Sequence, residues 1–109
     1  VIILMDENTA SAAESFVEGS AESSKVVTIG RATMGINDYS DLVIKNWGNK
    51  YALHYPVSKL STLTEHHPIF GTGIKPDVHV VWTPEFIKAD KDLERALEIL
   101  ESKFVLKNI

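Results

Sequence analysis

The chain has 109 residues, of which 44% are hydrophobic and 24% charged, as in a globular protein rather than a disordered, collagen-like or coiled-coil chain. Its 15 acidic and 11 basic residues give a net charge of −4 without a cluster of lysine and arginine, which argues against a nucleic-acid partner. The lack of cysteine excludes disulfides and thiolate zinc sites, and the longest apolar run, residues 1–5, is too short to span a bilayer.

The first part of the chain has the pattern of a β-α-β unit. Residues 1–5 form a continuous apolar run, as in a strand covered on both faces. A helix is expected over residues 11–21, followed by a second buried strand at residues 26–29. The apolar side of this helix is formed by Ala12, Ala13, Phe16 and Val17. Because the chain starts directly in such a strand, with valine instead of methionine, we expect it to be the C-terminal part of a longer polypeptide.

A loop and a hairpin follow. Residues 30–38 contain two glycines and are expected to form the loop. Residues 39–45 and 50–57 alternate as strands do, and the residues between them have the chemistry of a hairpin turn. Pro56 cannot donate a hydrogen bond to a neighbouring strand, so the second strand should lie at an edge.

The last part combines a long loop with a clear helix. Residues 58–75 are rich in Thr, Ser, His, Pro and Gly, and loops of this length are often functional. A short strand is expected over residues 78–82, and a helix should begin near Asp90 or Asp92. Its helical apolar spacing predicts that it packs on the sheet through Leu93, Ala96, Leu97, Leu100 and Phe104.

One hydroxyl lies at the junction of the first strand and the first helix. Ser11 is placed where the unpaired N–H groups and the positive end of the helix dipole converge, and the Ala12 N–H could face an oxyanion there. The spacing Ser11-x-x-Glu14 is also a capping box, in which each side chain satisfies the backbone N–H of the other residue. The residues alone leave both interpretations open, a nucleophile or a helix cap.

Four segments in register resemble one family across nearly the whole chain. They are TASAAE at 9–14, VVTIGRATMG at 26–35, GTGIKPDVHV at 71–80 and DKDLERALEIL at 90–100. Together they resemble the C-terminal half of the catalytic domain of the C-terminal processing (tail-specific) serine proteases, a family that includes tricorn-type proteases and interphotoreceptor retinoid-binding protein.

The resemblance implies a fold, a site and a substrate class. It implies an α/β fold with a ClpP/crotonase-like spiral core, in which residues 1–109 are the C-terminal part of a single peptidase domain whose N-terminal part is absent. It carries Ser11 over as the nucleophile and the Ala12 N–H as an oxyanion donor, with Gly30, Thr33 and Gly35 shaping the substrate cleft. It implies polypeptide substrates and no cofactor, and it is compatible with a homo-oligomer and with extracytoplasmic or membrane-associated placement.

The chain departs from the family at the position of the general base. Where the tail-specific branch has a lysine in the motif T-F-G-K-G, this chain has Ile36, which cannot take a proton. Arg31 is no substitute, because a guanidinium stays protonated. Two alternatives follow: an upstream histidine, as in relatives of the tricorn branch, or a non-catalytic binding protein in which Ser11 only caps a helix. A crotonase-type acyl-thioester enzyme ranks last, because it would need neither this serine nor the GIKPD turn.

The long loop contains the remaining candidates. Glu65 matches the glutamate with which tricorn-type relatives orient their active site, although its distance from Gly73 is longer than in the family pattern. His66 and His67 are adjacent and lack a third ligand at metal-binding spacing, so no metal site is predicted. Isolated from the rest of its domain, the chain is expected to be inactive.

Overall fold

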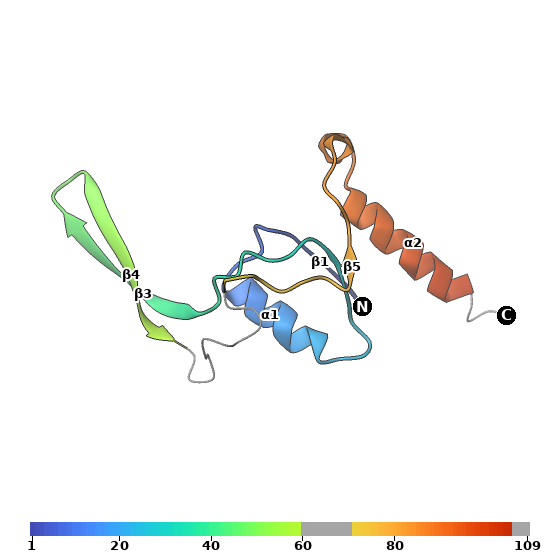
Figure 1. Cartoon of the computed structure of the whole chain (residues 1–109), viewed down its shortest axis with the longest axis horizontal. Helices are drawn as coiled ribbons and strands as arrows, with labels where there is room; N and C mark the ends of the chain where they lie inside the picture. The colour runs from blue at the N-terminus through green and yellow to red at the C-terminus, as the bar shows by residue number, and fades with distance from the viewer. Residues whose placement is uncertain (60–70, 106–109) are drawn as a thin grey trace.

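The computed structural model describes residues 1–59 and 71–105, and its body is a three-stranded parallel sheet with the order β1-β2-β5 (Figure 1). The strands are β1 (Ile2–Met5), β2 (Val27–Gly30) and β5 (Val78–His79), and the helix α1 (Ala12–Ala21) connects the first two. β1 pairs with β2 from Ile2 opposite Val27 to Met5 opposite Gly30. The predicted β-α-β unit is therefore confirmed.

The two neighbouring strands differ in burial. In β2, the central strand, the last three residues are buried, and Ile29 is completely enclosed. In β1, at the edge, only Met5 is buried and Leu4 is 41% exposed, so the described residues cover the first strand only in part. An edge strand has a neighbour on one side alone, which leaves part of its apolar surface uncovered.

The hairpin forms a separate two-stranded sheet that projects from the body (Figure 1). Its strands β3 (Tyr39–Trp47) and β4 (Tyr51–Lys59) pair from Tyr39 opposite Lys59 to Trp47 opposite Tyr51. Both strands end two residues beyond the predicted bounds, and β4 begins one residue later than predicted. The turn uses Gly48 at φ 61°, the left-handed conformation that glycine adopts without strain.

The C-terminal part differs from the prediction before its helix. The strand expected over residues 78–82 is reduced to β5, and the 3-10 helix η1 (Pro84–Ile87) follows. The final helix α2 (Lys91–Val105) lies against β1 and β2 as expected, with Ala96 buried. Leu93 and Leu97 are 46% and 49% exposed, however, because three short strands cover only a narrow strip of the helix.

The hydrophobic core is small. Among the described residues it consists of Met5, Val17, Ile29 and Ala96, and Phe16 on the predicted apolar side of α1 is 64% exposed. The fold is α/β, as predicted, while the ClpP/crotonase-like spiral core remains a prediction. None of the helices in the described part of the chain is long and apolar enough to cross a membrane.

Candidate active site

Ser11 occupies a strained turn between β1 and α1. Its backbone angles are φ 54° and ψ −120°, a positive φ that residues other than glycine rarely adopt. A serine on a sharp, strained strand-to-helix turn is the arrangement that exposes the nucleophile in α/β-hydrolases. Backbone strain of this kind is often found at functional sites, and Ser11 is also exposed.

The predicted capping box between Ser11 and Glu14 is present, and the bond from the Ser11 N–H to the Glu14 carboxylate is its better-formed half. The Glu14 carboxylate accepts a hydrogen bond of 3.0 Å from the Ser11 N–H. The Glu14 N–H donates to the backbone oxygen of Ser11 at 2.8 Å. The two residues have the arrangement of a capping box, but the Ser11 hydroxyl makes no cap hydrogen bond of full geometry. The hydroxyl lies at the Glu14 N–H in the manner of a capping box, but that N–H donates at 2.8 Å to the Ser11 backbone oxygen.

Glu14 is a completely buried carboxylate with donors on both oxygens. Its Oε1 accepts from the Thr33 hydroxyl at 2.6 Å and from the Gly35 N–H at 2.7 Å. Its Oε2 accepts from the Ile36 N–H at 3.0 Å, in addition to the Ser11 N–H. Glu14 thus joins the Ser11 turn to the loop at 33–36.

These hydrogen bonds also keep Glu14 ionised. Burial is the largest single influence on the carboxyl group and raises its pKa. The hydrogen bonds from Thr33, Gly35, Ser11 and Ile36 together outweigh burial, so the pKa of Glu14 lies below its ordinary value of 4.5. A carboxylate held by donors in this way has no free lone pair directed at Ser11, which argues against Glu14 as a general base.

The loop at 33–36 packs directly on the turn of the GTGIKPD segment. The Ile74 N–H donates to the Thr33 hydroxyl at 2.7 Å, and the Thr33 N–H donates to the Ile74 carbonyl at 3.0 Å. A Cβ on Gly73 would lie 2.1 Å from the Thr33 carbonyl oxygen, and one on Gly35 would lie 2.6 Å from the Gly73 nitrogen. Only glycine permits this approach.

A hollow of about 230 Å³ opens beside Ser11. It lies between the start of α1 and the segment that leads into β3, and its lining residues are Ser11, Ala12, Ser15, Asn37, Asp38, Tyr39 and Ser40. Within the described residues the Ala12 N–H has no acceptor, as a donor for an oxyanion requires.

The residues predicted to shape the cleft lie around this hollow rather than in its lining. Thr33 and Gly35 hold the loop against Glu14 and Gly73. Gly30 ends β2, where a Cβ would lie 2.0 Å from the Met5 carbonyl oxygen. Their role in the substrate cleft stays a prediction. In the structure these three residues hold the segment just before residues 37–40, which line the hollow.

Among the described residues, neither histidine nor lysine lines the hollow, and the carboxylate in its lining is that of Asp38, which accepts the Tyr39 N–H at 3.0 Å. Ile36, at the lysine position of the related proteases, is 47% exposed. Glu65, His66 and His67 lie outside the described residues. Within the residues that the structure describes, no group of His, Cys, Asp and Glu could hold a metal ion.

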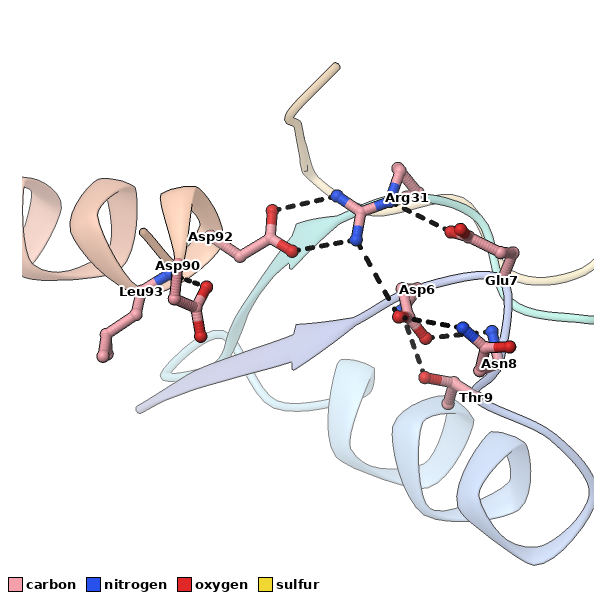
Figure 2. A network of polar contacts seen from close by, with 8 residues as sticks. All are labelled: Asp6, Glu7, Asn8, Thr9, Arg31, Asp90, Asp92 and Leu93. Carbon is pink, nitrogen blue, oxygen red and sulfur yellow. Dashed lines mark hydrogen bonds and ion pairs between the residues drawn. The ribbon is translucent and has the colours of Figure 1, made fainter. Parts of the chain in front are cut away.

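Arg31 connects the turn between β1 and α1 to the start of α2. Figure 2 shows its guanidinium between Asp92 at the start of α2, at 3.0 Å, and Glu7 in the β1–α1 turn, also at 3.0 Å. The guanidinium also lies over the Phe86 ring, 5.0 Å from its centre. Burial, the largest influence, lowers the pKa of Arg31, but the carboxylates of Asp92 and Glu7 outweigh it and raise the pKa, so Arg31 is a permanent cation.

The same network orders the residues that lead to Ser11. Asp6 accepts a hydrogen bond of 2.9 Å from the Asn8 N–H, and the Asp6 N–H donates to the Thr9 hydroxyl at 3.1 Å (Figure 2). Asp6 also lies 3.8 Å from the Arg31 guanidinium. A turn held at both ends can support the strained backbone of Ser11.

The comparison with protein families agrees with the motifs. Residues 1–80 match the profile of Peptidase family S41, and the chain therefore belongs to this family. This confirms the predicted relation to the C-terminal processing proteases and, at the level of the family, a serine peptidase that acts on polypeptides. No curated protein shows a significant match to the chain.

The sequence does not predict two features of the site. The capping spacing indicates the contact of Glu14 with Ser11 but not its bonds to Thr33, Gly35 and Ile36. Asn37 falls in the predicted loop at 30–38, and only the structure shows that its side chain accepts from Ser15 and lines the hollow. Neither has a local signal, because the partners of Glu14 lie 19 to 22 residues away.

Proposed function

We propose that Ser11 is the nucleophile of a serine endopeptidase that cleaves polypeptides through an acyl-enzyme. The observation that carries the proposal is the strained, exposed Ser11 at the start of α1, next to an open hollow and the unpaired Ala12 N–H. In this mechanism the Ser11 hydroxyl gives its proton to a base and attacks the scissile carbonyl, and the Ala12 N–H stabilises the oxyanion. The C–N bond then breaks, the amine product leaves with that proton, and an ester on Ser11 remains. Water attacks the ester, which releases the carboxylic acid product and restores the Ser11 hydroxyl.

The general base is proposed to be a histidine from an upstream part of the full-length polypeptide. A serine hydroxyl needs a proton acceptor within hydrogen-bond reach, and the described lining of the hollow has no histidine or lysine to provide it. In this proposal residues 1–109 are the C-terminal part of the catalytic domain, so that this chain alone does not hydrolyse peptides.

A fluorophosphonate probe on the full-length protein tests this function. We expect covalent labelling of Ser11 that is lost in Ser11→Ala and retained in Ser24→Ala, a control in the exposed α1–β2 connection. Mass spectrometry of the labelled peptide identifies the residue. Absence of labelling in folded protein would contradict the proposal.

One observation favours a second candidate, a non-catalytic peptide-binding relative. Ile36 stands where the related proteases have their lysine, and a binder would need no base. Such a protein would bind peptides with equal affinity in the wild type and in Ser11→Ala, and it would not react with the probe.

A further inference from the structure

We propose that Asn37 donates a second hydrogen bond to the oxyanion, from its side-chain amide, and that Ser15 orients it for this task. The inference rests on the proposed function of Ser11. Acyl transfer is accelerated most by donors that are already directed at the place where negative charge develops. Asparagine side chains can serve as such donors.

Asn37 has its carbonyl end fixed and its amino end free. The Ser15 hydroxyl donates to Asn37 Oδ1 at 3.0 Å. Asn37 is half-buried, and within the described residues its NH₂ group has no acceptor. A planar amide whose oxygen is held on one side presents its NH₂ group on the other.

Ser15 is well placed to hold Asn37 at the nucleophile. Ser11 is the N-cap of α1, and the Ser15 N–H in the first turn of the helix donates to the Ser11 carbonyl at 3.1 Å. Both serines and Asn37 line the same hollow of about 230 Å³. The Ser15–Asn37 bond therefore connects the helix face beside Ser11 to the segment that closes the hollow.

The other polar side chains of the hollow are less suitable. Asp38 is an acceptor and takes the Tyr39 N–H at 3.0 Å. The Ser40 hydroxyl is hydrogen-bonded to the Ser58 hydroxyl at 2.8 Å. In the part of the chain that the structure describes, the lining of the hollow has no basic side chain, so negative charge there would be met by neutral donors. The Tyr39 hydroxyl is the remaining alternative.

The test uses the full-length protein, with peptide hydrolysis and the rate of fluorophosphonate labelling as readouts. Asn37→Asp keeps an oxygen for Ser15 but removes the donor, and Asn37→Leu removes it without adding charge. We expect both variants to lower kcat about 100-fold to 1,000-fold with little change in KM, because the donor acts on the transition state. Labelling should slow in parallel.

Ser15 is tested as a positioning residue. Ser15→Ala frees the amide to rotate, and we expect kcat to fall about tenfold. Ser15→Thr keeps the hydroxyl and should restore most of the activity, which a purely structural role of the hydrogen bond would not require. Asn46→Asp on β3 repeats the amide-to-carboxylate change away from the hollow and should leave the rates unchanged.

The outcomes separate this inference from the proposed function. Wild-type rates in both Asn37→Asp and Asn37→Leu, with Ser11 still labelled, would overturn the role of Asn37 alone. If Tyr39→Phe lowers kcat and the labelling rate and the Asn37 variants do not, the donor is the Tyr39 hydroxyl and the role of Asn37 is overturned as well. If the wild type is not labelled at Ser11, the nucleophile and the oxyanion donor fail together.

Discussion

Glu14 shows how one buried side chain can determine the geometry of a candidate active site. Among the described residues it has no cationic partner, and its charge is balanced by a hydroxyl and three backbone N–H groups. A buried charge is tolerated only when it is fully hydrogen-bonded. Glu14 therefore fixes the Ser11 turn and the loop at 33–36 relative to each other.

Replacing Glu14 with glutamine should destabilise the full-length protein. Glutamine places an NH₂ group where one carboxylate oxygen now accepts two donors, so buried N–H groups lose their acceptor. We expect a loss of about 2–4 kcal/mol in the free energy of unfolding, measured by urea denaturation. Glu22→Gln, at the exposed end of the same helix, is the control and should change the stability little. Equal stabilities would show that the network contributes nothing.

Glu14 should also make the stability depend on pH in acid. Because its pKa is lowered on folding, its contribution is fully present above the ordinary value of 4.5 and is lost as the pH falls through the folded pKa. In the wild type, the urea concentration at the midpoint of unfolding should therefore decrease once the pH is lowered below about 4.5. The decline should be shallower in Glu14→Gln, and parallel curves would contradict this assignment.

At the scale of elements, the two loops beside α1 depend on glycine for close approach. Gly73→Ala should destabilise the protein, because the new Cβ would meet the Thr33 carbonyl oxygen and φ is +71°. Gly19→Ala, inside α1 with nothing within 4 Å, should instead stabilise it by about 0.5–1 kcal/mol. Thermal unfolding of both variants measures this difference in sign. A stabilised Gly73→Ala would show that the loops do not pack as described.

Arg31 joins three elements: β2, the turn after β1 and the start of α2. Arg31→Lys keeps the charge but loses the two-pronged contact with Asp92, whose side chain is 11% exposed. We expect a loss of about 1–2 kcal/mol, measured by urea denaturation. Arg95→Lys, in an exposed pair with Glu98, is the matched control and should change stability by less than about 0.5 kcal/mol. Equal effects would contradict the special role of Arg31.

The whole molecule is far more extended than a compact domain of its size. Its radius of gyration is 17.9 Å, whereas about 13 Å is typical for this length. The hairpin projects from the body of the molecule (Figure 1). Its large apolar side chains are exposed, including Trp47 at 67% and Tyr51 at 75%. Exposed apolar surface on this scale is characteristic of a face that another part of a protein covers.

This exposure leads to a prediction for the proposed domain organisation. Expressed alone, residues 1–109 should bind the dye ANS strongly and unfold without a cooperative heat-capacity peak. The full-length polypeptide should bind little dye and unfold cooperatively. Calorimetry and ANS fluorescence on the two proteins measure the difference, and cooperative unfolding of the isolated chain would contradict the proposal.

The sequence by itself determined the local units of this protein. The strand, helix and strand at the beginning, the hairpin at 39–59 and the helix α2 were predictable, because apolar periodicity and turn residues act over a few positions. The serine at the start of α1 and its capping partner were visible in the same way. The segment at 78–82 was overestimated as a strand, since β5 pairs with β2 through only two residues.

Only the tertiary structure decided how these units form a candidate site. The positive φ of Ser11, the burial of Glu14 and the hollow lined by Asn37 all depend on contacts between distant residues. The bond from Arg31 to Asp92 spans 61 positions, and that from Ile74 to Thr33 spans 41. Such contacts leave no periodic signal in a single sequence, because their energy depends on where the chain folds back rather than on neighbouring residues.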